Sequence, residues 1–120
     1  MKYIAENEGL ISFLTGEKSI LDGKISRFDI YYADFQLNID VYICLLYSND
    51  DKNLKLQFQN VTEYSMYHNS DHYFYYIERY KFFVCDRGFY ISFDPEEEVS
   101  DIQANDNDFI LSNGVAGYFL

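Results

Sequence analysis

Apolar and polar side chains alternate most clearly between residues 35 and 47. Every odd position in this segment is apolar or aromatic, and the first three even positions are polar. A period of two is typical of a β-strand with one face on a core. The later even positions Tyr42, Cys44 and Leu46 lose this polarity, which predicts that a helix or a second sheet covers the other face there. We therefore expect a central strand.

The flanking segments predict two neighbouring strands. Residues 25–32 are typical of a strand, and a change of phase at Ala33–Asp34 predicts a tight turn or a bulge before the next one. A polar cluster at 48–53 is followed by renewed alternation over 54–60, so the three strands should form an antiparallel meander. Residues 62–72 show no sustained period and predict a loop or a short helical turn.

A second hairpin is expected further along the chain. Residues 72–85 are rich in aromatic and β-branched side chains, which favour strands over helices. A turn at 86–88 and alternation over 89–93 predict the returning strand. Asp94–Pro95 should end it, because proline lacks the N–H that a ladder needs.

The two ends of the chain complete the prediction. A last strand is expected from residue 109 to the C-terminal region, bent or interrupted at Asn113–Gly114. The apolar positions within residues 6–15 fit a short helix that ends at Gly16.

These elements predict a mainly β fold in a single domain spanning residues 1–120. Its architecture would be a single antiparallel sheet or a sandwich of about six strands, with at most a short N-terminal helix. The predicted core comprises Leu37, Ile39, Val41, Ile43, Leu45, Leu56, Phe58 and Ile91.

Charge narrows the range of partners. The chain of 120 residues has 9 Lys and Arg against 20 Asp and Glu, a net charge of −11. We do not expect such a chain to bind nucleic acid, because affinity for phosphates requires clustered cations. No apolar run reaches the roughly 18 residues of a membrane helix, and acidic residues near the start do not fit a signal peptide. We expect a cytoplasmic protein without membrane contact.

Few residues suggest catalysis or a cofactor. Cys44 and Cys85 lie in apolar strand-like segments and are expected to be reduced core residues. His68 and His72 are four residues apart, but their polar surroundings favour a loop over a helix that would present both as ligands or catalysts. The expectation is a protein that is not an enzyme and holds no metal or cofactor.

The highest local concentration of charged residues is in an acidic segment after the second hairpin. It carries seven acids and no Lys or Arg, namely Asp94, Glu96, Glu97, Glu98, Asp101, Asp106 and Asp108. The spacing of Asp101, Asp106 and Asp108 suggests a calcium loop, but it lacks the glycine and terminal glutamate of an EF-hand, which favours a solvated turn. An anionic surface of this kind attracts basic proteins, whereas the simpler alternative is a solubilising loop.

Several segments resemble small bacterial immunity proteins of polymorphic-toxin and contact-dependent inhibition systems. The likeness lies in Asp22–Gly23–Lys24–Ile25 before the first strand, the alternating strand 35–47 and Phe93–Asp94–Pro95. It continues through the acidic segment and Asp106–Asn107–Asp108–Phe109–Ile110 to the final strand.

The resemblance implies a cofactor-free inhibitor that binds a cognate toxin domain, often a nuclease, and blocks its active site or a neighbouring surface. A nuclease must be basic to hold its substrate, so the acidic segment is the expected contact region. Two alternatives remain open at this stage: a β-barrel-like carrier of a small ligand lined by Tyr and Phe, and a homo-oligomeric interaction module. The sequence does not determine the oligomeric state.

Overall fold

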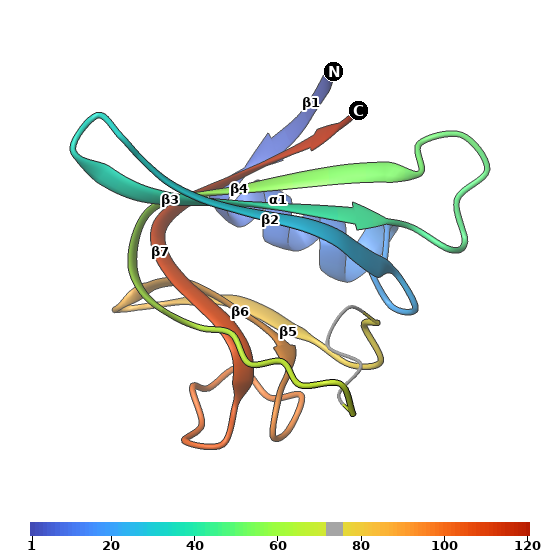
Figure 1. Cartoon of the computed structure of the whole chain (residues 1–120). Coiled ribbons are helices and arrows are strands. Elements are labelled where there is room, and N and C mark those ends of the chain that lie inside the picture. The colour runs from blue at the N-terminus through green and yellow to red at the C-terminus, as the bar shows by residue number, and fades with distance from the viewer. Residues whose placement is uncertain (72–75) are drawn as a thin grey trace.

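The computed structural model describes residues 1–71 and 76–120, and these form a mainly β fold with one antiparallel sheet (Figure 1). This confirms the predicted fold class. Within the described residues the strands are β1 (Lys2–Glu6), β2 (Lys24–Ala33), β3 (Gln36–Cys44), β4 (Asn53–Ser65), β5 (Lys81–Cys85), β6 (Gly88–Asp94) and β7 (Asn107–Phe119). The helical elements are α1 (Asn7–Ser12) and a π-helical segment η1 (Phe13–Glu17).

The sheet is organised around β7. Its strand order is β2-β3-β4-β7-β6-β5, and β1 also pairs with β7. One edge of β7 follows β4 along most of its length, whereas the other edge pairs first with β6 and then, from Ala116 onward, with β1. Figure 1 shows the result, in which β4 and β7 curve from an upper layer containing β1, β2 and β3 to a lower layer containing β5 and β6. The last strand is therefore bent, as expected, and it continues through Asn113–Gly114 without interruption.

The space between the layers holds the core. Of the predicted core residues, only Leu37 is partly exposed, and the other seven are buried. Helix α1 and segment η1 add Leu10 and Leu14, both fully buried. Leu10 packs so closely on β7 that a Cβ at Gly117 would come within 2.5 Å of its Cδ1 atom. Glycine at this position is what lets the helix approach the sheet.

The N-terminal helix was predicted correctly, but its end was not. The α-helix stops at Ser12, and the chain continues as η1, so Gly16 lies inside a helical segment instead of ending one. The preceding strand β1 was not predicted, because its five residues carry too little alternation to be recognised. Among the described residues, no helix is long and apolar enough to cross a membrane.

The second face of β3 differs from the prediction. Cys44 is exposed and Leu46 is 57% exposed, because the helix packs on the inner face of the sheet and leaves this outer face open. Cys44 is therefore not a core residue, and Cys85 is only partly buried. Two polar side chains of β3, Asn38 and Asp40, are buried instead, and the Asp40 carboxylate accepts a hydrogen bond of 3.0 Å from the Tyr31 hydroxyl.

Three strand boundaries were also wrong. The strand predicted over residues 35–47 spans only Gln36–Cys44, and residues 45–47 lie beyond its end. Strand β4 extends beyond the predicted end at residue 60 to Ser65, because a bulge between Val61 and Glu63 breaks the period of two that would have revealed it. In the aromatic segment 72–85, residues 72–75 lie outside the described part of the chain, and among residues 76–85 strand β5 begins at Lys81. The side chain of Ile77, just before β5, is fully buried in the core.

A tight two-residue turn joins β2 to β3, which resolves the turn or bulge expected at Ala33–Asp34. Asp34 and Phe35 form it, with φ values of 55° and 63°. This left-handed conformation costs roughly 1–2 kcal/mol per residue for a side chain with a Cβ. The Phe35 side chain is fully exposed and offsets none of that cost through packing.

We therefore expect Phe35→Gly to stabilise the protein by about 1 kcal/mol, because glycine adopts positive φ without a steric penalty. Urea denaturation measures the change. Phe35→Ala is the matched control, since it removes the same aromatic ring but keeps the Cβ, and it should leave stability nearly unchanged. Equal stabilisation by both variants would contradict the backbone explanation.

Candidate functional site

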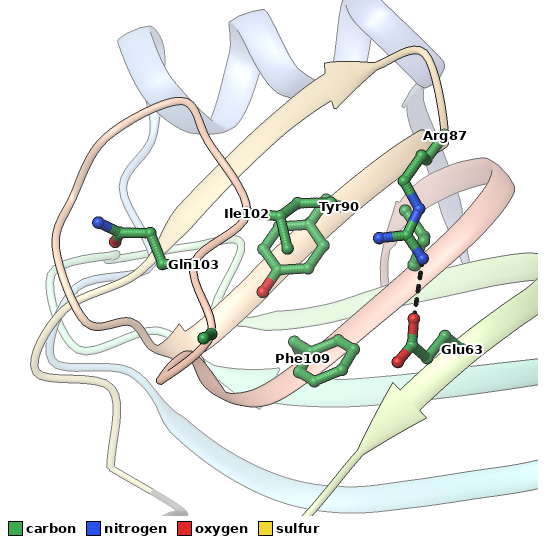
Figure 2. Close-up of a pocket in the computed structure, with 8 residues that line it drawn as sticks. Glu63, Arg87, Tyr90, Ile102, Gln103 and Phe109 are labelled. Carbon is green, nitrogen blue, oxygen red and sulfur yellow. Dashed lines mark hydrogen bonds and ion pairs between the residues drawn. The ribbon is translucent and has the colours of Figure 1, made fainter.

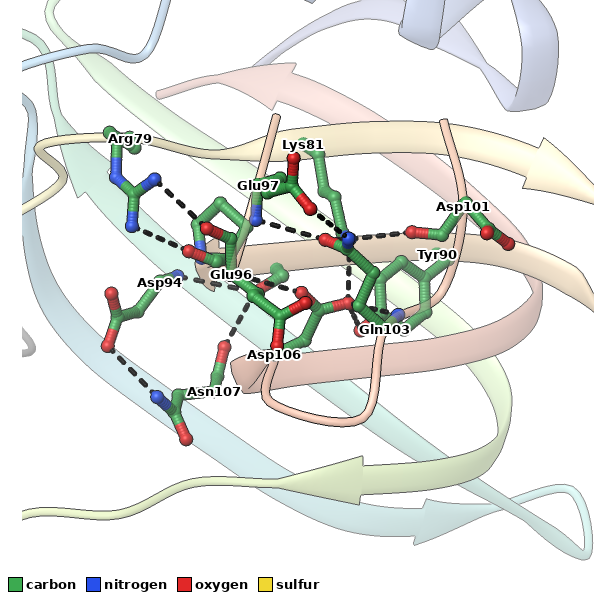
Figure 3. Close-up of polar contacts among 12 residues, drawn as sticks. Arg79, Lys81, Tyr90, Asp94, Glu96, Glu97, Asp101, Gln103, Asp106 and Asn107 are labelled. Atoms are coloured by element: carbon green, nitrogen blue, oxygen red, sulfur yellow. Dashed lines mark hydrogen bonds and ion pairs between the residues drawn. The ribbon is translucent and has the colours of Figure 1, made fainter. Parts of the chain in front are cut away.

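The acidic segment forms an irregular loop between β6 and β7, here called the anionic loop and defined as residues 95–106 (Figure 3). It covers the outer face of the lower layer, where Phe83, Tyr90 and Leu111 form a second, smaller hydrophobic cluster. Strand β6 is therefore buried on both faces, by the main core on one side and by this loop on the other.

The seven predicted site residues separate into two groups. Four side chains are exposed and Asp94 is partly exposed, whereas the last two acids are buried. The exposed four are Glu96, Glu97, Glu98 and Asp101, and the buried two are Asp106 and Asp108. Neither buried carboxylate faces solvent, so a partner at the loop surface would meet the exposed group. The expected solvated turn is therefore wrong for Asp106 and Asp108.

A buried ion pair fixes the loop to the sheet. The Lys81 Nζ atom lies 2.8 Å from the Asp106 Oδ2 atom, and their side chains are only 4% and 1% exposed. The same ammonium donates hydrogen bonds to the backbone oxygen of Asp101 at 2.6 Å and to the Oε1 atom of Gln103 at 3.2 Å. Lys81 thus binds three points of the loop from β5.

Asp106 collects the remaining bonds of this network. Its carboxylate accepts the Tyr90 hydroxyl at 2.7 Å and the backbone N–H groups of Glu96 at 3.0 Å and Gln103 at 2.9 Å. It therefore joins the beginning and the end of the loop to β6. Each buried polar group in this network has partners, which is the condition under which buried charges are tolerated.

The network shifts two pKa values. Burial alone would raise the pKa of Asp106, but hydrogen bonds from Lys81 and from the two backbone N–H groups outweigh it and hold the pKa below its ordinary value. Burial, followed by the hydrogen bond to Asp106, raises the pKa of Tyr90. Tyr90 therefore remains a hydroxyl donor at neutral pH.

The structure shows what occupies the position where a calcium ion was considered. Oxygens of Asp101, Gln103 and Asp106 do converge on one point, but the Lys81 ammonium occupies it. Asp108 turns away from the loop and accepts the backbone N–H of Tyr67 at 3.0 Å. The Lys81 ammonium thus binds several oxygens of the loop together, as a bound metal ion does in a calcium loop.

Further contacts hold the exposed part of the loop in place. The Arg79 guanidinium donates to the backbone oxygen of Pro95 at 2.6 Å. Glu97 and Gln103 bond reciprocally: the Glu97 N–H donates to the Gln103 Oε1 atom at 3.0 Å, and the Gln103 Nε2 atom donates to the Glu97 Oε1 atom at 2.9 Å. Figure 3 shows these contacts bridging the two sides of the loop.

The exposed carboxylates are not neutralised by neighbours. In the part of the chain that the structure describes, Glu96, Glu97, Glu98 and Asp101 form no side-chain ion pair. Arg79, the nearest exposed cation that contacts the loop, bonds to backbone oxygens instead. The loop therefore presents fixed negative charges to solvent.

The sequence did not reveal Lys81, Tyr90 or Gln103 as part of this site. The position of Lys81 could have indicated a buried ion pair. A lysine between Tyr80 and Phe82 in an apolar strand must either reach solvent or pair with a buried anion. The anion itself could not be chosen from seven candidates without the fold.

The remaining candidate residues do not assemble into a second centre. Over residues 1–71 and 76–120, no group of three or more His, Cys, Asp and Glu side chains is placed to hold a metal ion. His68 lies on an exposed irregular segment, and its predicted companion His72 falls outside the described residues. Comparison with protein-family models, with curated proteins and with solved structures gives no significant match for the chain.

Removing the buried cation should strongly destabilise the protein. We expect Lys81→Met to cost about 3–5 kcal/mol, because it leaves the Asp106 carboxylate buried without its counterion. The double variant with Lys81→Met and Asp106→Asn should recover a large part of this loss. Urea denaturation of the single and double variants measures both effects, and a cost below about 1 kcal/mol for the single variant would contradict the assigned role.

Acid should weaken the same contact. The folded-state pKa of Asp106 lies below its ordinary value of 3.8, so the unfolded chain takes up this proton first as pH falls. The stability that its charge contributes is complete above about pH 5 and is lost as pH falls below about 4. Stability measured from pH 7 to pH 3 should decline less in Asp106→Asn than in the natural protein, and parallel declines would contradict this.

Proposed function

We propose that this protein is a cytoplasmic immunity protein that binds and neutralises a cognate bacterial toxin domain and catalyses no reaction itself. The main observation in support is the anionic loop, which exposes four carboxylates and whose backbone is anchored to the sheet by the buried Lys81–Asp106 pair. The network holds the backbone of the loop in one shape, so that its exposed acids are gathered on one ordered surface.

The fixed geometry favours protein binding for an energetic reason. A loop that is already ordered loses little conformational entropy when it docks, so more of the contact energy becomes affinity. Its charges are also concentrated on one segment, which raises the rate of encounter with an oppositely charged surface. The partner should therefore carry a basic surface patch.

A nuclease-type toxin fits this description best. Such an enzyme holds phosphates with Lys and Arg side chains, and an acidic loop can occupy the same cations. The net charge of −11 adds a long-range attraction to such a partner and repels nucleic acid itself. The resemblance to small immunity proteins supports the same class of partner.

The first experiment identifies the partner by capture with the tagged protein from host lysate at low salt. The eluted proteins are identified by mass spectrometry. The proposal requires a stoichiometric basic protein whose toxicity or enzymatic activity is abolished by the purified immunity protein. Recovery of a tightly bound small molecule, or only of the protein itself, would support the carrier or the oligomer instead.

The contact region is tested on the purified complex. Replacing Glu96, Glu98 and Asp101 together by Lys should lower the association rate by about tenfold or more at low salt. The matched control replaces three exposed acids elsewhere, Glu17, Asp50 and Asp71, by Lys and changes net charge equally. Surface plasmon resonance compares the two variants. Equal losses would show that only net charge matters and would contradict the loop as the contact.

A further inference from the structure

A pocket of about 390 Å³ lies at the end of the anionic loop (Figure 2). Residues 102–104, which follow directly after Asp101, form one wall of it. Strands β4, β6 and β7 and the turn between β5 and β6, which carries Arg87, supply the rest. The lining consists of Glu63, Arg87, Tyr90, Ile102, Gln103, Ala104, Phe109 and Leu111. Its volume is in the range of sites that bind side chains or small ligands.

Aromatic rings form the base of the pocket. Tyr90 and Phe109 are stacked, with ring centroids 5.6 Å apart and planes 26° from parallel. Tyr90 is almost fully buried and is packed against Ile102, whereas Phe109 is only partly buried. The Phe109 ring is therefore an accessible, electron-rich part of the pocket lining, on the same side as Glu63 in Figure 2. Such a face attracts a cation.

The Glu63 carboxylate lies near the Phe109 ring in Figure 2. The Glu63 Oε1 atom lies 2.9 Å from the Arg87 Nη2 atom, and the two side chains are 53% and 54% exposed. An ion pair this exposed contributes about 0–1 kcal/mol, so it exchanges easily with another partner. Arg87 also demonstrates that Glu63 can bind a guanidinium group in this pocket.

The charge around the pocket favours a cation as the occupant. Among the lining residues the one cation, Arg87, is paired with the one anion, Glu63, and the exposed acids of the anionic loop end at Asp101, directly before the wall formed by residues 102–104. Arginine fits better than lysine, because a guanidinium is planar, stacks on aromatic rings and sheds its weaker hydration more readily than an ammonium.

We propose that this pocket binds an arginine side chain, stacked on Phe109 and paired with Glu63, which displaces Arg87. As the anchor of a basic toxin in the complex, this rests on the proposed function. Arginine recognition by the pocket itself does not, and it can be measured without the toxin. The loop would then attract the partner by charge, and the pocket would hold one of its side chains.

The test uses N-acetyl-L-arginine methylamide and the isotope-labelled full-length protein. Chemical shifts in NMR spectra should change at residues 102–104 and 109–111 in a saturable way. Glu63→Gln should weaken this binding by about threefold or more, because it removes the carboxylate that receives the guanidinium. Arg87→Gln should strengthen it by a similar factor, because it removes the competing guanidinium.

The controls separate charge at the pocket from charge in general. Glu8→Gln removes the same charge on the N-terminal helix and should leave affinity for the arginine probe unchanged. The corresponding leucine and glutamate probes should bind more weakly than the arginine probe. Absence of saturable shifts, equal binding of the leucine probe, or preferred binding of the glutamate probe would each overturn the proposal. These outcomes leave the loop charge-reversal experiment unaffected, so failure of the pocket is distinguishable from failure of the proposed function.

Discussion

The geometry of the candidate site depends on one buried ion pair, Lys81 with Asp106. An isolated carboxylate or ammonium in this environment would be too costly, but the two charges compensate each other and are surrounded by hydrogen bonds. Their attraction draws the ends of the anionic loop onto β5 and β6, and the loop in turn seals the hydrophobic cluster beneath it. A polar contact therefore sets the shape of an exposed acidic surface whose own charges repel one another.

This arrangement explains how a strongly acidic segment can remain ordered. Seven carboxylates within fifteen residues favour an extended, solvated chain if all of them are ionised and free. Two of the seven are instead directed inward, where Asp106 meets a cation and Asp108 meets a backbone N–H. The remaining charges are carried on a loop with fixed ends. For association with a basic protein, such an ordered surface combines fast encounter with a low entropic cost of docking.

Local periodicity predicted the fold well and the site poorly, for identifiable reasons. Alternation over residues 35–47 identified β3 and its buried face, because a period of two reports directly which side chains face a core. The bulge after Asn60 concealed the end of β4 by shifting that period. The seven acids look alike in sequence, and what distinguishes Asp106 in the loop is Lys81, 25 positions away on β5. Burial and pairing of this kind depend on tertiary structure, and no local pattern encodes them.

The central claim is that a preordered anionic loop recognises a basic protein, and the salt dependence of association tests it most directly. Stopped-flow measurements on the natural protein and its captured partner give the association and dissociation rates from low to high ionic strength. We expect the association rate to fall steeply with added salt while the dissociation rate changes little. An association rate that is independent of salt would contradict it.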